Sequence, residues 1–312
     1  MVEALGRFSY RHNMNMIAPG QGKAEMPPDL PACTGPGPVV ITAARSWRGA
    51  ASSAIQDIRE TLRLWPLVWT LSLFDIRLRY RGSMLGPFWL TMSTAIMVGS
   101  IGFLYSRLFH QNVDSYLPFL TVSLVLWTFV STITAESSVC FTQSETMIRA
   151  MRMPHSLHAA RVVMRNLLVL AHNLVVILAV FIIFRAAPNP SVFTLLPASV
   201  LWFADAFALS LILGAIGARF LDIPPIIGSI MQIVFYLTPI MWNPAMLMHR
   251  GLAFTLIEIN PFFSIVEIMR GPLLGQPVEL NVWHMALGYS TILIALAFLV
   301  FTRARPRIPY WV

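Results

Sequence analysis

VWHMALGYSTILIALAFLVF, residues 282–301, contains no Asp, Glu, Lys or Arg. A helix of this length rises about 30 Å, which matches the hydrocarbon thickness of a bilayer. Residues 224–242, PPIIGSIMQIVFYLTPIMW, are also free of charged side chains. Because lipid cannot hydrogen-bond an open backbone, both stretches predict transmembrane helices.

Four further apolar segments continue this pattern toward the N-terminus, at residues 86–108, 117–137, 162–184 and 195–218. The composition agrees, since 56% of the residues are hydrophobic and only 12% are charged. A soluble domain carries about a quarter charged residues. The sequence therefore predicts an all-α integral membrane protein with six transmembrane helices.

Residues 1–50 differ in composition from the rest of the chain. The stretch Ala18–Pro38, APGQGKAEMPPDLPACTGPGP, is dense in Pro and Gly and has no helical period. Such a segment buries too little apolar surface to fold. We expect a disordered tail at 1–50 and a single membrane domain at 51–312. The two cysteines, Cys33 and Cys140, predict neither a structural disulfide nor a metal site.

The basic residues indicate which ends of the spans face the cytoplasm. With the N-terminus inside, the inside segments carry 18 of the 22 basic residues and the outside segments carry 4. Cytoplasmic loops of membrane proteins are enriched in Lys and Arg. Both termini are therefore expected in the cytoplasm. The net charge of +8 is explained by this rule, so no nucleic-acid partner is expected.

Two segments do not fit a span. Residues 54–81, divided by Pro66, predict an amphipathic helix at the membrane interface before the first span. Residues 243–281 form an outer segment with apolar runs on both sides of Asn260-Pro261. This pattern predicts two short re-entrant or surface helices that meet at Asn260-Pro261, between spans five and six.

The sequence contains no motif for nucleotide binding or catalysis. A phosphate-binding loop of the form GxxxxGK[ST] needs a lysine, and the one lysine, Lys23, is followed by Ala24. His155 and His158 lie three residues apart, but no carboxylate or cysteine ligand is adjacent, which disfavours a metal site. We expect no catalytic residue, cofactor or metal on this chain, which is therefore not expected to be an enzyme.

Two acids lie within or beside the predicted spans. Asp205 is deep in the fourth span, where ionisable groups are costly and often functional. It is either a functional group, such as a proton carrier, or a structural hydrogen-bond partner of a neighbouring helix, and both interpretations stay open. Glu136 lies near the inner end of the second span, where it can reach the membrane interface.

Aromatic residues at the outer margin also allow two interpretations. They form either an aromatic belt or a ring at a pore mouth that stacks on sugar rings, and the belt is the simpler interpretation for any single residue. The residues concerned are Phe109, Tyr116, Trp242, Phe254, Phe262 and Phe263.

Residues 75–90, DIRLRYRGSMLGPFWL, resemble the motif before the first span in permeases of type-2 ABC exporters, specifically the polysaccharide, O-antigen, capsular and teichoic-acid export group. The matching residues are Arg79, Tyr80, Ser83, Leu85, Gly86 and Trp89, in a cluster that also contains Asp75, Arg77 and Arg81. Later stretches also resemble the group: Phe235–Trp242 (FYLTPIMW), Asn260–Gly275 (NPFFSIVEIMRGPLLG) and Arg305–Val312 (RPRIPYWV). The chain departs from the pattern at Leu221-Asp222, where many members have Arg-Asp.

The resemblance implies a permease that dimerises and binds two separate ATPase subunits, which carry the ATP and Mg²⁺. It also implies a cytoplasmic docking helix between spans two and three, here about residues 143–158. Ser144 is placed to cap that helix and Pro154 to end it. The docking surface is expected to comprise Glu145, Met147, Arg149, Arg152, Met153 and Pro154.

The function implied by the resemblance is ATP-driven export of a lipid-linked polysaccharide across the bacterial inner membrane. Two alternatives stay open. One is export of a drug or lipid by a permease of the same class. The other is proton-coupled secondary transport that uses Asp205.

Overall fold

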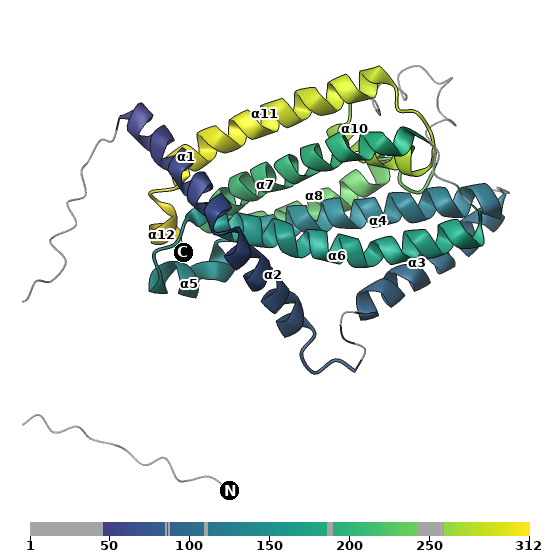
Figure 1. The fold of residues 1–312 in the computed structure, drawn as a ribbon, viewed down its shortest axis with the longest axis horizontal. Coiled ribbons are helices and arrows are strands. Elements are labelled where there is room, and N and C mark those ends of the chain that lie inside the picture. The colour runs from purple at the N-terminus through teal and green to yellow at the C-terminus, as the bar shows by residue number, and fades with distance from the viewer. Residues whose placement is uncertain are drawn as a thin grey trace, which may run out of the picture. The chain divides into compact units, whose positions relative to one another are not determined.

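The computed structural model describes residues 46–84, 86, 88–108, 112–185, 190–242, 257 and 259–312. These residues form helices and short connections, with no strand among them. The apolar helices lie alongside one another (Figure 1). They are α3 (Phe88–Leu108), α4 (Val113–Ser137), α6 (His155–Ile183), α7 (Leu195–Arg219), α8 (Ile223–Leu237) and α11 (Leu280–Ala304).

Five of these helices, α3, α4, α6, α7 and α11, are long and apolar enough to cross a membrane. The prediction of an all-α membrane protein is confirmed. The helix in the fifth predicted span, α8, has 15 residues and rises about 22 Å, less than a hydrocarbon core. It ends at Leu237 because Pro239 favours an extended backbone at Thr238 (φ −93°, ψ 135°).

Helix α4 is central to the packing of the chain. It contacts α3, α6, α7, α8 and a further helix, α10 (Pro261–Leu273). Helix α7 approaches the C-terminal end of α4 closely at Gly217, where a Cβ atom would lie 1.8 Å from the Ser138 carbonyl oxygen. The Ser137 and Ser210 hydroxyls bond across the two helices at 2.7 Å. Small and hydroxyl residues thus allow the close approach that membrane helices use in place of a hydrophobic driving force.

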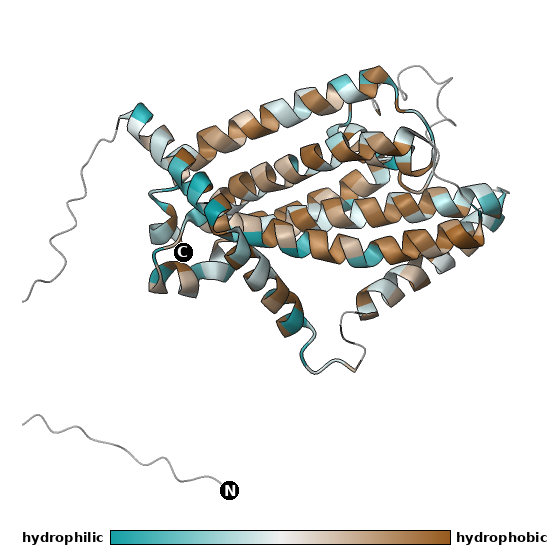
Figure 2. Ribbon diagram, viewed as in Figure 1, coloured by the Kyte–Doolittle hydropathy of each residue, from teal (hydrophilic) through white to brown (hydrophobic). Residues whose placement is uncertain are grey.

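Helices α3 and α8 expose much of their apolar surface. Figure 2 shows hydrophobic residues along the long helices and more hydrophilic residues on α1. Large apolar side chains are exposed on both, among them Ile96 and Phe103 on α3, and Ile233 and Leu237 on α8. This surface requires lipid or another protein chain as its solvent.

The segment before the first span forms two helices, α1 (Trp47–Arg63) and α2 (Trp65–Arg79). The predicted division is confirmed, since Pro66 lies in the first turn of α2. Helix α1 begins before residue 51, so the predicted boundary of the tail falls inside a helix. Residues 1–45 lie outside the described part of the chain.

The docking segment differs from its prediction. It comprises a 3-10 turn, η1 (Thr142–Ser144), and a short helix, α5 (Glu145–Ala150). The expectation of one helix ended by Pro154 is wrong, because α5 ends at Ala150 and Pro154 immediately precedes α6. Ser144 occupies the N-cap position, but its side chain makes no cap bond and instead donates to the Cys140 carbonyl at 2.9 Å.

The outer segment is described in part. Helix α10 begins at Pro261, where the sequence placed the start of the second outer helix. The Asn260 side chain accepts a hydrogen bond from the Phe262 amide at 3.0 Å and so caps the helix. The first predicted outer helix falls mostly on residues outside the described part. The remaining elements are η2 (Pro190–Thr194) and, after α11, the short α12 (Ile308–Trp311).

Candidate functional site

A cluster of charged residues, most of them buried or half-buried, joins α2, α4 and α6. Asp75 of α2 pairs with Arg161 and Arg165 of α6, with Arg161 Nε donating to Asp75 Oδ2 at 2.7 Å and Arg165 Nη1 to the same oxygen at 3.1 Å. Arg165 also donates to Glu136 Oε2 of α4 at 2.8 Å. Arg79 donates to the other Glu136 oxygen at 2.7 Å.

The centre of this charged cluster is largely removed from solvent, whereas Arg79 at its edge is 44% exposed. The side chains of Arg165 and Asp75 are 9% and 10% exposed, and Glu136 is 16% exposed. Asn166 is a third residue that donates to Glu136, at 2.7 Å. Removing one partner from such a network leaves a buried charge uncompensated. The cluster therefore fixes the position of α2 against the C-terminal part of α4 and the N-terminal part of α6.

The residues of the motif before the first span fall into two groups. Asp75 and Arg79 belong to the charged cluster, whereas Arg77 and Arg81 are exposed and have no ion-pair partner in the described part of the chain. Tyr80 follows α2 and is half-buried. Ser83 accepts a hydrogen bond from the Gly86 amide at 3.2 Å, and Gly86 has a φ of 55° that favours glycine. Leu85 lies outside the described residues.

Glu136 is directed into the charged cluster, a contact that the sequence did not predict. That it lies at the membrane interface stays a prediction. In the sequence, Arg161 and Arg165 were counted only among the basic residues that predict which ends of the spans face the cytoplasm. Their pairing with Asp75 spans 86 and 90 residues of sequence, a separation over which spacing carries no information.

A second polar centre lies at Asp57 of α1, whose side chain has no solvent exposure. Asp57 Oδ1 accepts from the Ser156 amide at 2.9 Å, and Oδ2 accepts from the His155 amide at 3.2 Å. Pro154, at the N-cap of α6, provides no capping side chain. Asp57 therefore caps α6 from a different helix.

Asp57 also receives a hydrogen bond from Arg305, next to the end of α11, at 2.7 Å. Burial alone would raise the pKa of Asp57, but the hydrogen bonds from His155, Ser156 and Arg305 hold its pKa below the usual range of a carboxyl. One side chain thus joins α1, α6 and the end of α11. Ser53, Asp57 and Thr61 lie four residues apart and form one buried stripe of α1. In the sequence, this polar spacing is only a weak signal of a buried position.

The docking residues are arranged on and after α5. Arg149 forms an i,i+4 ion pair with Glu145 at 2.9 Å and donates to the main-chain oxygen of Val312 at 2.6 Å. Arg152 is exposed and has no ion-pair partner in the described part. Met147 contacts Arg161, with its Sδ 3.9 Å from Nη1. Met153 is half-buried and Pro154 is buried. Arg149 is therefore anchored within the chain, whereas Arg152 is free.

The segment after α11 packs beside α5. Ile308 and Val312 are buried, and the Arg219 guanidinium lies 5.7 Å from the Trp311 ring centroid. Together with the Arg149–Val312 hydrogen bond, these contacts join α5 to the C-terminal ends of α7 and α11. These contacts give Trp311 and Val312 a structural role, whereas Tyr310 is exposed.

At the other end of the helices, Arg270 of α10 is 1% exposed. Its Nη1 donates to Ser123 Oγ of α4 at 3.1 Å and to the Pro239 carbonyl at 2.6 Å, and it pairs with Glu267. The guanidinium lies 4.8 Å from the Phe119 ring centroid. Sequence reasoning counted Arg270 only as an outside charge. It instead fixes α10 against α4 and the turn after α8.

The predicted outer aromatic residues are mostly packed within the chain. Tyr116 is 4% exposed and donates to the Met241 carbonyl at 2.7 Å. Phe263 is 6% exposed, Phe262 contacts Trp127, and Trp242 is half-buried. For Tyr116 and Phe263 the expectation of an exposed ring for sugar stacking is wrong, because their ring faces are covered. Phe109 and Phe254 lie outside the described residues.

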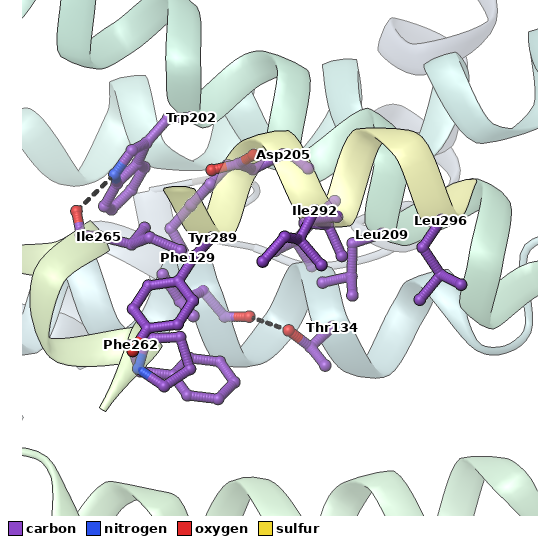
Figure 3. A pocket seen from close by; sticks show the side chains of 15 residues that line it. Phe129, Thr134, Trp202, Asp205, Leu209, Phe262, Ile265, Tyr289, Ile292 and Leu296 are labelled. Carbon is purple, nitrogen blue, oxygen red and sulfur yellow. Dashed lines mark hydrogen bonds between the residues drawn. The ribbon is translucent and has the colours of Figure 1, made fainter. Parts of the chain in front are cut away.

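Asp205 lines an apolar cavity between α4, α7, α10 and α11 (Figure 3). It is 6% exposed, and its Oδ2 accepts a hydrogen bond from Ser290 of α11 at 2.7 Å. The structural interpretation of Asp205 thus has one identified partner. Within the described residues, no group of three or more His, Cys, Asp or Glu side chains could hold a metal ion.

Comparison with known proteins places the charged cluster, α5 and α10 within one family domain. Residues 66–274 match the family model described as ABC-2 type transporter. This chain belongs to the ABC-2 type transporter family. The matched region excludes Asp57, Arg305 and the segment 308–312.

Curated relatives of this ABC-2 transporter chain are permease subunits. It is 24% identical over 213 residues to the O-antigen export system permease protein RfbA of Myxococcus xanthus, covering 68% of this chain and 82% of that protein. It is 22% identical over 248 residues to the protein of the same name from Klebsiella pneumoniae, covering 78% of this chain and 94% of the relative. The chain is therefore similar to transport subunits along most of their length.

Proposed function

We propose that this chain is the membrane-spanning subunit of an ATP-driven exporter that moves a lipid-linked polysaccharide, such as O-antigen or a capsular glycan, across the bacterial inner membrane. The observation that carries this proposal is the ABC-2 match over residues 66–274, joined to relatives named for O-antigen export. Those names favour a polysaccharide over a drug or small lipid as the substrate.

The exporter comprises two copies of this chain and two separate ATPase subunits that bind ATP and Mg²⁺. The exposed apolar faces of α3 and α8 support association with a second copy. The α5 segment is the docking element for the ATPase, with Met151 and Arg152 exposed beside it. The charged cluster and Asp57 connect this segment through α6 to α1, α2 and α4. A movement of the ATPase would therefore move these helices together.

Proton-coupled transport through Asp205 has less support. Asp205 is bonded to Ser290, and none of the other described residues that line its cavity is an acid, a base or a histidine. A proton carrier needs a chain of titratable groups or water leading to both sides of the membrane. The described lining contains no such chain.

The proposal is tested by partnership and export together. The purified chain alone is expected to show no ATP hydrolysis, because its sequence has no phosphate-binding loop. Affinity purification from cells should recover a separate ATPase subunit with it, and deletion should remove the polysaccharide from the cell surface. Robust hydrolysis by the chain alone, or an unchanged surface glycan in the deletion strain, would refute the proposal.

For the topology we propose six spans, with residues 224–242 as the fifth, α10 entering the membrane from outside, and both termini in the cytoplasm. In a background lacking Cys33 and Cys140, cysteines introduced at Asn189 and Gln276 should react with a membrane-impermeant thiol reagent on spheroplasts. Cysteines at Gln143 and Arg303 should react only after lysis, because the inside segments carry 18 of 22 basic residues. Labelling of Arg303→Cys in intact spheroplasts would exclude an even number of spans.

A further inference from the structure

The Asp205 cavity has a volume of about 270 Å³ and an almost entirely apolar lining (Figure 3). Phe129 and Trp202 stack beside it, with ring centroids 5.2 Å apart. Asp205 is the only acidic residue among the described residues that line it, and none of them is basic. On α11, Ile292 and Leu296 line the cavity and are themselves exposed, so an apolar molecule has access from the hydrocarbon phase.

Nearly all polar groups around the cavity have hydrogen-bond partners. Thr134 Oγ1 donates to the Val130 carbonyl at 2.6 Å, Trp202 Nε1 to the Ile265 carbonyl at 2.7 Å, and the Tyr289 hydroxyl to the Ile259 carbonyl at 2.5 Å. Asp205 Oδ2 accepts from Ser290. Asp205 Oδ1 is buried and has no partner among the described residues. The cavity therefore offers one unmet hydrogen-bonding position, and buried polar atoms are rarely left unpaired.

The volume and the lining together select the type of occupant. A cavity of 270 Å³ has room for about nine groups the size of a water molecule. Water in such a space needs 2–4 polar partners per molecule, as a rough rule, and the lining offers a single free one. A hydrocarbon chain of comparable size fits the lining, provided that it carries one hydrogen-bond donor.

The depth of Asp205 decides the charge of that occupant. Asp205 lies ten residues from the start of α7, so it is about 15 Å along the helix and near the middle of the hydrocarbon core. A charged or zwitterionic lipid headgroup at that depth is costly. A neutral hydroxyl is not subject to that penalty.

We propose that this cavity is a binding site for a neutral amphiphile, a long-chain alcohol or a comparable single-hydroxyl lipid. Its hydroxyl donates to Asp205 Oδ1, and its chain lies against Phe129, Leu209 and Leu296. The site is separate from the docking segment and does not depend on which molecule the exporter moves.

The test uses 1-decanol and a decanol analogue bearing a photoreactive diazirine, with the purified chain in lipid nanodiscs. Irradiation should place adducts on the cavity-lining peptides of α4, α7 and α11, and excess 1-decanol should remove them. Leu296→Trp fills the mouth and should abolish this labelling. Leu299→Trp is the matched control, since Leu299 is exposed on the same helix and does not line the cavity.

A second variant isolates the hydrogen bond. Asp205→Leu keeps a side chain of similar size and removes the acceptor, so competition by 1-decanol should weaken about tenfold, the effect of one hydrogen bond. A diazirine hydrocarbon without a hydroxyl should label the parent chain and Asp205→Leu equally. The proposal is overturned if adducts are spread over exposed faces, if Leu296→Trp labels like Leu299→Trp, or if cross-linking shows a second copy of the chain filling the cavity.

Discussion

Replacing Asp57 with alanine is expected to lower the unfolding temperature of the detergent-purified chain by several degrees. The change removes the cap of α6 and leaves Arg305 without its carboxylate, at the point where α1, α6 and α11 meet. Breaking a buried, hydrogen-bonded ion pair by removing one partner costs about 3 to 5 kcal/mol. Thermal unfolding followed by intrinsic tryptophan fluorescence measures the effect.

The matched control for this variant is Glu60→Ala, three residues further along α1. Among the described residues, the side chain of Glu60 bonds only Gln56, in an exposed hydrogen bond, so its removal should change the unfolding temperature little. Equal effects of the two substitutions would show that Asp57 does not have the capping role. Asp57→Asn should fall between them, because an amide oxygen still accepts from α6 but carries no charge for Arg305.

The same site predicts a dependence of stability on pH. The folded state holds the pKa of Asp57 below that of the unfolded chain, so its contribution is fully present above the unfolded pKa of about 4. It is lost as the pH falls from there toward the lower folded pKa. The difference in stability between the parent chain and Asp57→Ala should therefore be constant from about pH 6 to 7 and shrink below about pH 4. A difference that grows on acidification would contradict this assignment.

The spans were predictable because lipid cannot hydrogen-bond the backbone, which must therefore form its hydrogen bonds within a helix. A long apolar run must be helical, and both Pro66 and Asn260-Pro261 mark helix boundaries where the sequence placed them. The ends of helices were less predictable. Helix α6 begins seven residues before its predicted span, because Asp57 caps it from a position 99 residues earlier in the chain.

The candidate site was predictable only where a motif identified its residues. Asp75 and Arg79 were found through the resemblance of residues 75–90. Arg165 and Arg270 were counted as loop charges, since hydropathy and charge counting do not reveal which helix face packs inward. Both prove to be buried at junctions between elements far apart in sequence. Pairing over such separations depends on the packing of the whole domain, and no local pattern encodes it.

The largest functional effect is expected from charge reversal at the docking segment. The double variant Arg149→Glu, Arg152→Glu should abolish appearance of the glycan at the cell surface. Arg149 lies on α5 and Arg152 lies just after it, so reversing both replaces positive charge on the docking segment by negative charge. Like-charge contact across a protein interface costs several kcal/mol.

The structure predicts different roles for the two arginines. Arg152 is free, so Arg152→Glu should weaken recovery of the ATPase while leaving α5 in place. Arg149→Glu should displace α5 itself, because it removes the hydrogen bonds to Val312 and sets a second carboxylate beside Glu145. A spin label at Thr146, exposed on α5, should therefore become more mobile in Arg149→Glu and remain unchanged in Arg152→Glu.

Both arginines also contribute to the positive-inside signal, so topology needs its own control. Arg307→Glu removes an exposed basic residue predicted to face the cytoplasm, outside the docking segment, and should leave export and membrane abundance normal. Asp205→Asn should reduce export only modestly, whereas a proton carrier would show the reverse pattern. Full export by the double variant at normal abundance would exclude α5 as the docking element, because no working contact with an ATPase survives reversal of both charges.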